Sequence, residues 1–423
     1  MKFKFFKPLT ALATMSLVLS ACGGGTPTAT NSPATSPTAG ASPASSPGAS
    51  PAAGKFTVGV IMVGPKNDKG WSQGHYEAVT EYVTQKIPDV KVEFVDKVNP
   101  ADRPNVKGSQ VADDLIAKGA QVIIFNSDDF KDDALATAQK HPKVTVIHAS
   151  GDYAWKDGKN FKNLSNLGNF MPEMEYGRML TGCVAALSSE SGKIGFLGPL
   201  INDETRRLVS ATYLGARHCW EKYRQKDAKD LDFKVTWIGF WFNIPGVTLD
   251  PTKVADEFYN GGYDVVISGI DTPEAGVQAK KAVAAGKKVQ FTSYGLKSGC
   301  DTAPEVCLGV PVYNWGPAYT EAVKQTKAGS FKGEFIWGKP DWKNLNSADT
   351  SSVGFVRGKA LTEANGKSFD EFIKTLGDKS VNLYQGPLKF QDGTDFLKAG
   401  ETATPQQIWY MPQLLQGIQG SSK

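Results

Sequence analysis

The chain has 423 residues, of which 40% are hydrophobic and 21% charged, and its formal net charge is +4. This length is enough for two globular domains with sizeable cores. Without the three N-terminal lysines, Lys2, Lys4 and Lys7, 44 basic residues face 43 acidic ones. Such a balance gives no electrostatic footprint for nucleic acid, so we expect no nucleic-acid partner.

The N-terminus predicts export and lipidation. The three lysines precede an apolar run at 9–19, which is too short to span a membrane and is typical of a signal peptide. Small residues then lead to Cys22, in a pattern that resembles a bacterial lipobox. The alternative is an ordinary secretory cleavage site with a chance cysteine. We expect residues 1–21 to be a lipoprotein signal peptide and Cys22 to carry the lipid anchor.

Residues 23–54 consist almost entirely of Gly, Ala, Ser, Thr and Pro, without a charged or aromatic residue. Such a composition cannot form a core, so residues 22–54 are predicted to be the lipidated cysteine and a disordered tether. A flexible tether of this length reaches about 30 Å. It is expected to hold the folded part near the extracytoplasmic face of the cell membrane.

From residue 55 onward, apolar runs alternate with amphipathic segments, which favours α/β structure with parallel sheets covered on both faces. A first set has predicted strands at 58–63, 90–95, 122–126 and 144–148, and predicted helices at 73–85, 104–118 and 132–140. A second set has predicted strands at 193–197, 234–240, 264–268, 289–294 and 307–313. Its predicted helices are at 174–188, 205–223, 253–260, 274–285 and 317–328.

Two sets of similar size indicate two lobes. The tail at 331–423 alternates less clearly and is expected to pack around both lobes, with its end fraying beyond about residue 417.

The turn after the first predicted strand is the leading candidate for ligand contact, because ligands of doubly wound folds bind beyond the carboxyl ends of the strands. Asn67 and Asp68 offer hydrogen-bonding groups there, and Trp71 offers a flat face for stacking. His75 lies one helical turn later. The alternatives are a turn residue for Asn67, a helix cap for Asp68, local packing for Trp71 and a surface or core position for His75.

Other candidates follow later predicted strands. We expect ligand contacts from Ser127, Phe130, Trp241, Asp271 and Trp315, with local packing as the alternative for the aromatic residues. The acidic pair at 128–129 has no further acid or His at a metal-binding spacing, so no metal site is expected. The motifs GxGxxG, GxSxG, HExxH and CxxC are missing, and neither a cofactor nor catalysis is predicted.

Four cysteines remain after Cys22 in an exported protein, where disulfides are allowed. Cys300 and Cys307 are seven residues apart and would close a short loop, and Cys183 and Cys219 lie on successive predicted helices. The alternative is four buried free thiols.

Residues 55–423 resemble the basic membrane protein (BMP) family of substrate-binding lipoproteins, whose founding members are purine nucleoside receptors. The resemblance lies in the turn Asn67-Asp68-Lys69-Gly70-Trp71 with Val63-Gly64-Pro65 before it and His75 after it. It continues in Glu175-Tyr176-Gly177-Arg178, Ile194-Gly195-Phe196-Leu197-Gly198 and Trp315-Gly316-Pro317. The family's strand-end acid near the sugar is replaced here by Ser293-Tyr294-Gly295, which weakens the expectation of ribose recognition.

The resemblance implies a type I periplasmic-binding-protein fold, with two doubly wound parallel-sheet lobes joined by three crossover strands near 166–170, 312–315 and 349–354. The first lobe would comprise 55–167 plus 314–350, and the second 168–313 plus 351–423. The implied function is a lipid-anchored, monomeric receptor of an ABC importer. It would bind a purine nucleobase or nucleoside through Trp71 and Asp68 and deliver it to a permease. The alternatives are a ligand sensor for a signalling partner and a secreted nucleoside hydrolase.

Overall fold

The computed structural model describes residues 55–423. The expected signal peptide, Cys22 and the tether therefore lie outside the described residues. Across 55–423, no helix combines the length and the apolar character needed to cross a membrane.

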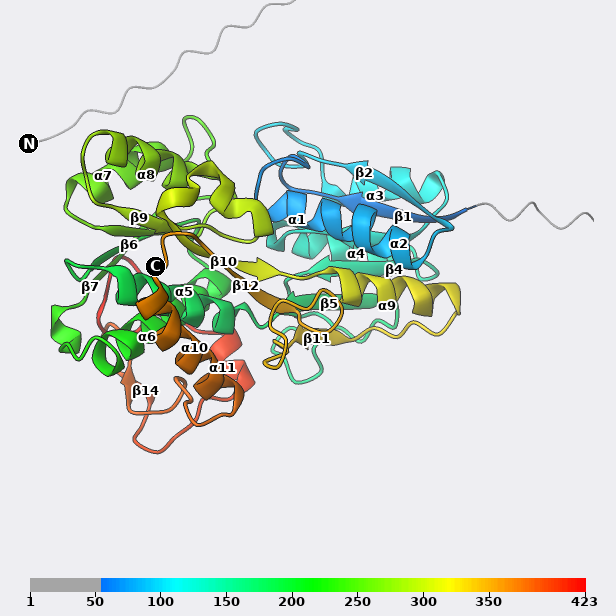
Figure 1. The fold of residues 1–423 in the computed structure, drawn as a ribbon. Helices are drawn as coiled ribbons and strands as arrows, with labels where there is room; N and C mark the ends of the chain where they lie inside the picture. Colours follow the sequence, from blue (N-terminus) through cyan, green and yellow to red (C-terminus); the bar gives the residue numbers. More distant parts are fainter. Residues whose placement is uncertain (1–54) are drawn as a thin grey trace, which may run out of the picture. The chain divides into compact units, whose positions relative to one another are not determined.

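Within the described residues, the first sheet has six parallel strands in the order β11-β5-β4-β3-β1-β2 (Figure 1). Its strands are β1 (Phe56–Ile61), β2 (Val90–Val95), β3 (Ala120–Phe125), β4 (Thr145–Ala149), β5 (Leu167–Pro172) and β11 (Phe335–Gly338). The helices of this part are α1 (Trp71–Glu77), the π-helix η1 (Ala78–Val83), α2 (Thr84–Lys86), α3 (Gly108–Ala117), the 3₁₀-helix η2 (Asp128–Phe130), α4 (Lys131–Lys140) and α9 (Gly316–Lys327).

The second sheet has the order β12-β10-β9-β8-β6-β7-β15, and only the pair β10–β12 is antiparallel among the strands described in it. Its strands are β6 (Lys193–Gly198), β7 (Asp232–Trp237), β8 (Val265–Ser268), β9 (Gln290–Thr292), β10 (Cys307–Tyr313), β12 (Val353–Arg357) and β15 (Ile418–Gln419). The helices around it are α5 (Met174–Ser188), α6 (Asp203–Lys222), α7 (Pro251–Asn260), α8 (Glu274–Ala284), α10 (Glu363–Gly377) and α11 (Pro405–Trp409). Short elements complete it: η3 (Ala228–Asp230), η4 (Lys297–Thr302), η5 (Pro304–Val306), β13 (Leu388–Lys389) and β14 (Asp395–Leu397).

The chain passes between the two sheets three times: from β5 to α5, from β10 to α9, and from β11 to β12. The expected boundary at 167/168 falls at the start of β5. Both neighbours of β5 belong to the first sheet, so that sheet extends to Pro172. The expected α/β fold with two sheets and three connections is confirmed.

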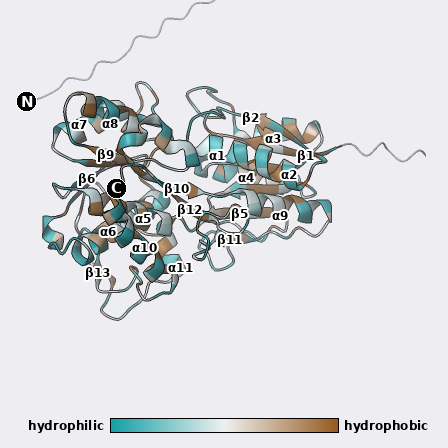
Figure 2. Ribbon diagram, viewed as in Figure 1, coloured by the Kyte–Doolittle hydropathy of each residue, from teal (hydrophilic) through white to brown (hydrophobic). Residues whose placement is uncertain are grey.

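The apolar runs form the core, as expected for strands that are buried on both faces. In Figure 2 the apolar residues are concentrated on the strands. In β1, residues 57–61 are all buried, and β10 is buried along its whole length. Two disulfides cross-link elements that pack around the second sheet. Cys183–Cys219 joins α5 to α6 with a Cα–Cα distance of 5.1 Å, and Cys300–Cys307 joins η4 to the start of β10.

The tail differs from the expectation in two ways. It forms α10 and packs mainly on the second sheet's side, where Phe369 and Phe372 are fully buried. It also does not fray beyond residue 417, because Ile418 is buried and pairs with Phe233 of β7 at the edge of the sheet. The prediction of a frayed end was therefore wrong.

Candidate functional site

A small closed cavity, with room for about one water molecule, lies at the carboxyl ends of strands from both sheets. Each lining residue follows a strand: one follows β1, two follow β3, and one follows each of β6, β7, β8 and β9. These residues are, in chain order, Trp71, Ser127, Asp128, Glu204, Trp241, Asp271 and Tyr294. The position agrees with the rule that ligands bind beyond the strand ends in doubly wound sheets.

Trp71 is the aromatic side chain that the first sheet contributes to this cavity, and its neighbours fix the ring. Its indole N–H donates to the carbonyl oxygen of Asn126. Tyr313 and Trp315 meet the ring at steep angles, with centroids 5.0 and 5.3 Å away. A tryptophan held in this way presents a fixed surface, so little conformational freedom is lost when a flat ligand packs on it.

Asp68 caps the helix and does not line the cavity. Its carboxylate accepts hydrogen bonds from the backbone N–H groups of Gly70, Ser72 and Gln73 at 2.9, 2.8 and 3.0 Å. Burial raises the pKa of this carboxyl, and the three backbone donors oppose the shift. Asp68 therefore acts as a cap for the start of the helix. It lies outside the cavity lining, where the contact with a ligand was expected.

The turn also brings the two sheets into close contact at Gly70. A Cβ atom at this position would lie 2.0 Å from the carbonyl oxygen of Asp271, which follows β8 of the second sheet. Only glycine permits this approach. The two loops therefore touch at the edge of the cavity.

Four more of the expected contacts lie outside the cavity lining. Asn67 is exposed on the turn, and Phe130 is buried against Phe125 in the core of the first sheet's side. His75 and Trp315 stack on each other behind Trp71, with ring centroids 4.3 Å apart. The spacing of His75 placed it correctly one helical turn after Trp71, but its side chain points into the interior. Trp315, at the start of α9, packs in the same place.

His75 is a buried core histidine. It is fully inaccessible to solvent, and its Nδ1 lies 2.8 Å from the hydroxyl of Tyr319. Burial holds the pKa of His75 well below its usual range. The imidazole is therefore neutral at physiological pH and supports Trp71 rather than carrying charge.

Three acidic side chains face the cavity: Asp128, Glu204 and Asp271. Burial raises the pKa of Glu204 to about 7, and it raises that of Asp271 well above its usual range. Buried carboxyl groups that lack a cation favour their neutral form or a ligand that donates hydrogen bonds.

Asp128, Glu204 and Tyr294 were not among the ligand contacts predicted from the sequence. The same strand-end rule would have found them, because they follow β3, β6 and β9. Glu204 lies in the first turn of α6, where an acidic residue is usually explained by the helix dipole.

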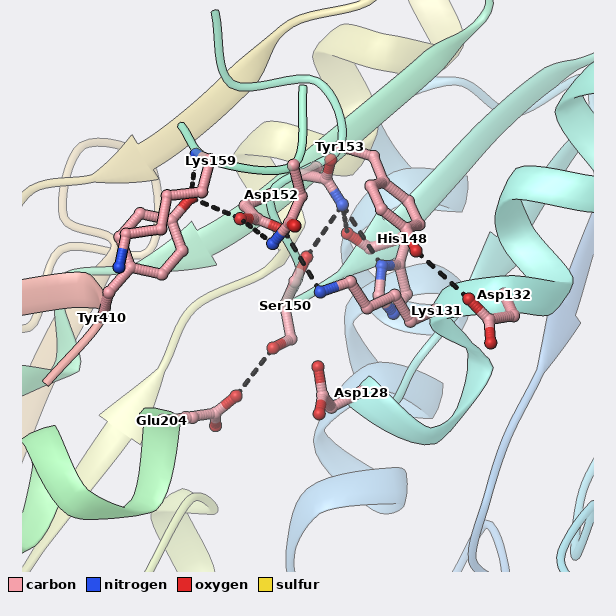
Figure 3. Close-up of polar contacts among 12 residues, drawn as sticks. Asp128, Lys131, Asp132, His148, Ser150, Asp152, Tyr153, Lys159, Glu204 and Tyr410 are labelled. Carbon is pink, nitrogen blue, oxygen red and sulfur yellow. Dashed lines mark hydrogen bonds and ion pairs between the residues drawn. The ribbon is translucent and has the colours of Figure 1, made fainter. Parts of the chain in front are cut away.

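Hydrogen bonds connect residues of the two sheets around the cavity. Ser150, which follows β4, donates to Glu204 over 2.6 Å, as Figure 3 shows. Trp241 donates through its indole N–H to Asp129 at 2.9 Å. Asn202 donates to Asp128 at 3.2 Å. These bonds hold the cavity in a closed arrangement.

A second, more open cavity of about 370 Å³ adjoins the first and shares Asp128 and Glu204 with it. In Figure 3, Tyr410 of the tail approaches Asp152 of the first sheet's side, to which its hydroxyl donates. Lys131 forms an ion pair with the same carboxylate at 3.3 Å. The tail thus contributes a further contact between the two sides.

The combination of aromatic walls, buried carboxyl groups and a closed cavity suits the capture of a flat small molecule that carries N–H donors. In residues 55–423, no group of three or more His, Cys, Asp or Glu side chains is arranged to hold a metal ion.

Two doubly wound sheets, three connections and a cavity between the strand ends define the type I periplasmic-binding fold. The model of the family "Bmp: ABC transporter substrate-binding protein PnrA-like" matches residues 55–348. The chain therefore belongs to this family of ABC transporter substrate-binding proteins, as its resemblance to the BMP family implied.

A curated relative is 28% identical over 365 residues, which cover 86% of this chain and 93% of that protein. It is a purine-binding protein of Brucella abortus (strain 2308).

Solved structures show the same fold. A solute-binding protein of an ABC transporter system from Aeropyrum pernix K1 superposes with a TM-score of 0.60 at 13% identity, covering 79% of this chain and 93% of that one. A second, from Conexibacter woesei DSM 14684, has a TM-score of 0.55 at 16% identity, covering 77% of this chain and 98% of that one.

Proposed function

We propose that this protein captures a purine nucleobase or nucleoside in the cavity between the two sheets and delivers it to an ABC permease. The observation that carries the proposal is that Trp71 and Tyr294 line the same cavity as three acidic side chains. Aromatic rings stack on the faces of purines, and carboxyl groups accept hydrogen bonds from their ring and amino N–H groups. The purine-binding relative supports this choice of ligand.

In this proposal Trp71 is the stacking partner of the base, a contact worth roughly 1–3 kcal/mol. Asp271 reads the polar edge of the base, because it is 4% exposed and lines the cavity. Asp68 acts indirectly, since it fixes the start of the helix that carries Trp71. Ser127 and Trp241 complete the wall.

In the closed arrangement the cavity has room for only about one water molecule, so a base would enter when the two sides move apart. The ribose of a nucleoside would extend past Asp128 and Glu204 into the larger adjoining cavity.

The proposed setting is a monomeric lipoprotein anchored through Cys22 on the extracytoplasmic face of the cell membrane. No covalent chemistry is needed for this role, because closure around the ligand excludes water and completes the contacts together.

Calorimetry with adenine, guanine, adenosine and guanosine tests the proposal. We expect at least one of the four to bind, and Trp71→Ala to weaken it by roughly 1–3 kcal/mol. The matched control is Trp342→Ala, since Trp342 packs on Tyr176 away from the cavity and its loss should leave affinity unchanged. Binding of a sugar or an amino acid in place of any purine would overturn the ligand assignment while leaving the fold and family intact.

A further inference from the structure

Two arginines are fully buried on the second sheet's side, and their surroundings differ. Arg207 of α6 is 1% exposed and forms an ion pair with Glu175 at 2.6 Å. Arg178 of α5 is equally buried, yet no ion pair with a carboxylate is found for it among residues 55–423. A buried charge without a counter-ion is costly, so an arginine kept in this state calls for a functional explanation.

The guanidinium group of Arg178 packs on aromatic rings instead. Its central carbon lies 3.8 Å from the ring centroid of Tyr294 and 5.2 Å from that of Phe196. One N–H donates to the carbonyl oxygen of Ser268 at 2.8 Å, and Nε is buried without a hydrogen-bond partner. The main partner of the cation is therefore the π face of Tyr294.

Tyr294 connects this arginine to the ligand cavity. It lines both the ligand cavity and a narrow neighbouring one that Arg178 also lines. The hydroxyl of Tyr294 lies 2.6 Å from that of Tyr313, whose ring meets Trp71 at a centroid distance of 5.0 Å. A continuous series of contacts thus runs from Arg178 through both tyrosines to the proposed stacking tryptophan.

We propose that Arg178 is a positioning and specificity residue: it fixes the Tyr294 wall of the cavity and makes the site prefer neutral aromatic ligands over cationic ones. The inference rests on the proposed function in that it concerns how the same cavity selects among purines. Beyond the proposed function, it names the charge of the ligand as the property by which the cavity selects.

The physical reason is the electrostatics of the ring. An aromatic face attracts cations, and a cation already bound to Tyr294 opposes a second one nearby. A preference for cationic ligands would come from the carboxyl groups of Asp128, Glu204 and Asp271 if they were ionised. A buried, permanently charged guanidinium offsets these carboxyl groups.

The decisive measurement compares two isomers of one purine at pH 6: 1-methyladenine, which is then a cation, and neutral 6-methyladenine. The wild type should prefer the neutral isomer. Arg178→Met keeps an unbranched apolar stem and removes the charged guanidinium group, and it should reduce this preference by about tenfold. Arg178→Lys retains the charge and should keep the preference within about threefold of the wild type. An unchanged preference in Arg178→Met would overturn the assignment, whereas a general loss of affinity for both isomers would show structural support only.

A second readout needs no ligand and separates this inference from the proposed function. NMR signals of the Tyr294 ring should shift in Arg178→Met, and the ring should flip faster, while those of Tyr259 should not change. Tyr259 is a suitable internal control because it is equally buried but bonded to Ala275. If the Tyr294 signals match the wild type, the positioning role is excluded, even if no purine binds.

Discussion

The side chains of Ser150 and Glu204 share a hydrogen bond of 2.6 Å that joins the two sides of the ligand cavity. Ser150 follows β4 of the first sheet, and Glu204 lies in the first turn of α6 on the second sheet's side. Because Glu204 is buried at the junction of the two sides, its protonation is coupled to whether the cavity is closed.

Ligand affinity should therefore depend on pH. Burial raises the pKa of Glu204 to about 7 in the closed cavity from an ordinary value of 4.5, so closing takes up a proton between these values. A raised carboxyl pKa favours the closed form at low pH, and this advantage is lost as pH rises to about 7. Affinity for whichever of the four purines binds should fall between pH 5 and pH 7 and then level off.

The matched variant is Glu204→Gln, which keeps the hydrogen-bonding shape without a titrating group and should flatten the pH profile. Calorimetry at several pH values provides the measurement. Affinity that rises with pH in the wild type would show instead that the ligand pairs with ionised Glu204.

Gly70→Ala should block closure. The added Cβ would lie 2.0 Å from the carbonyl oxygen of Asp271, and separation of the two loops is the simplest relief. We expect a loss of affinity of about tenfold or more with little change in melting temperature, because the clash is absent in an open cleft. Gly74→Ala on the same helix is the control, since its Cβ would meet only a Leu296 methyl group at 4.0 Å. Wild-type affinity in Gly70→Ala would contradict the contact.

The two disulfides should contribute unequally to stability. Cys183–Cys219 spans 36 residues and Cys300–Cys307 spans 7. Loop-closure entropy then gives about 4 kcal/mol for the first bridge and about 2 kcal/mol for the second. Chemical denaturation of the two double Cys→Ala variants measures both values. A larger loss from the short bridge would mean that native contacts, rather than chain entropy, set the order.

Membrane attachment should require Cys22. Expression of Cys22→Ala in a bacterial host that processes lipoproteins should release or mislocalise the protein, because acyl chains on Cys22 are the proposed membrane anchor. Fractionation after a salt wash gives the result, with Cys300→Ala plus Cys307→Ala as a cysteine-removal control that stays attached. Retention of the Cys22 variant on washed membranes would disprove the anchor.

Most of the fold was predictable because parallel strands buried on both faces leave a strong signal. The apolar run at Val90–Val95 was located to the residue, and the run that forms β10 likewise. Shorter strands in the tail, such as β15, were missed. A strand of two residues is too short to show an alternating apolar pattern in the sequence. Ile418 is held in place by its pairing with the edge strand β7.

The candidate site was only partly predictable. Strand-end position correctly brought Trp71, Ser127, Trp241 and Asp271 to one cavity. The direction of each side chain was decided by tertiary contacts, which turned His75 toward Tyr319 and filled the acceptor sites of the Asp68 carboxylate with backbone donors. Neither outcome has a local sequence signal.

The contact between Tyr410 and Asp152 has a practical consequence for anyone who produces this protein. The matched family region ends at residue 348, yet the last 75 residues supply β12, α10 and the pairing of β15 with β7. Arg206 donates to the backbone oxygens of Met411 and Ser422, so even the final residues are integrated. A version of the protein cut at residue 348 would therefore lose β12, the pairing of β15 with β7 and the contact between Tyr410 and Asp152.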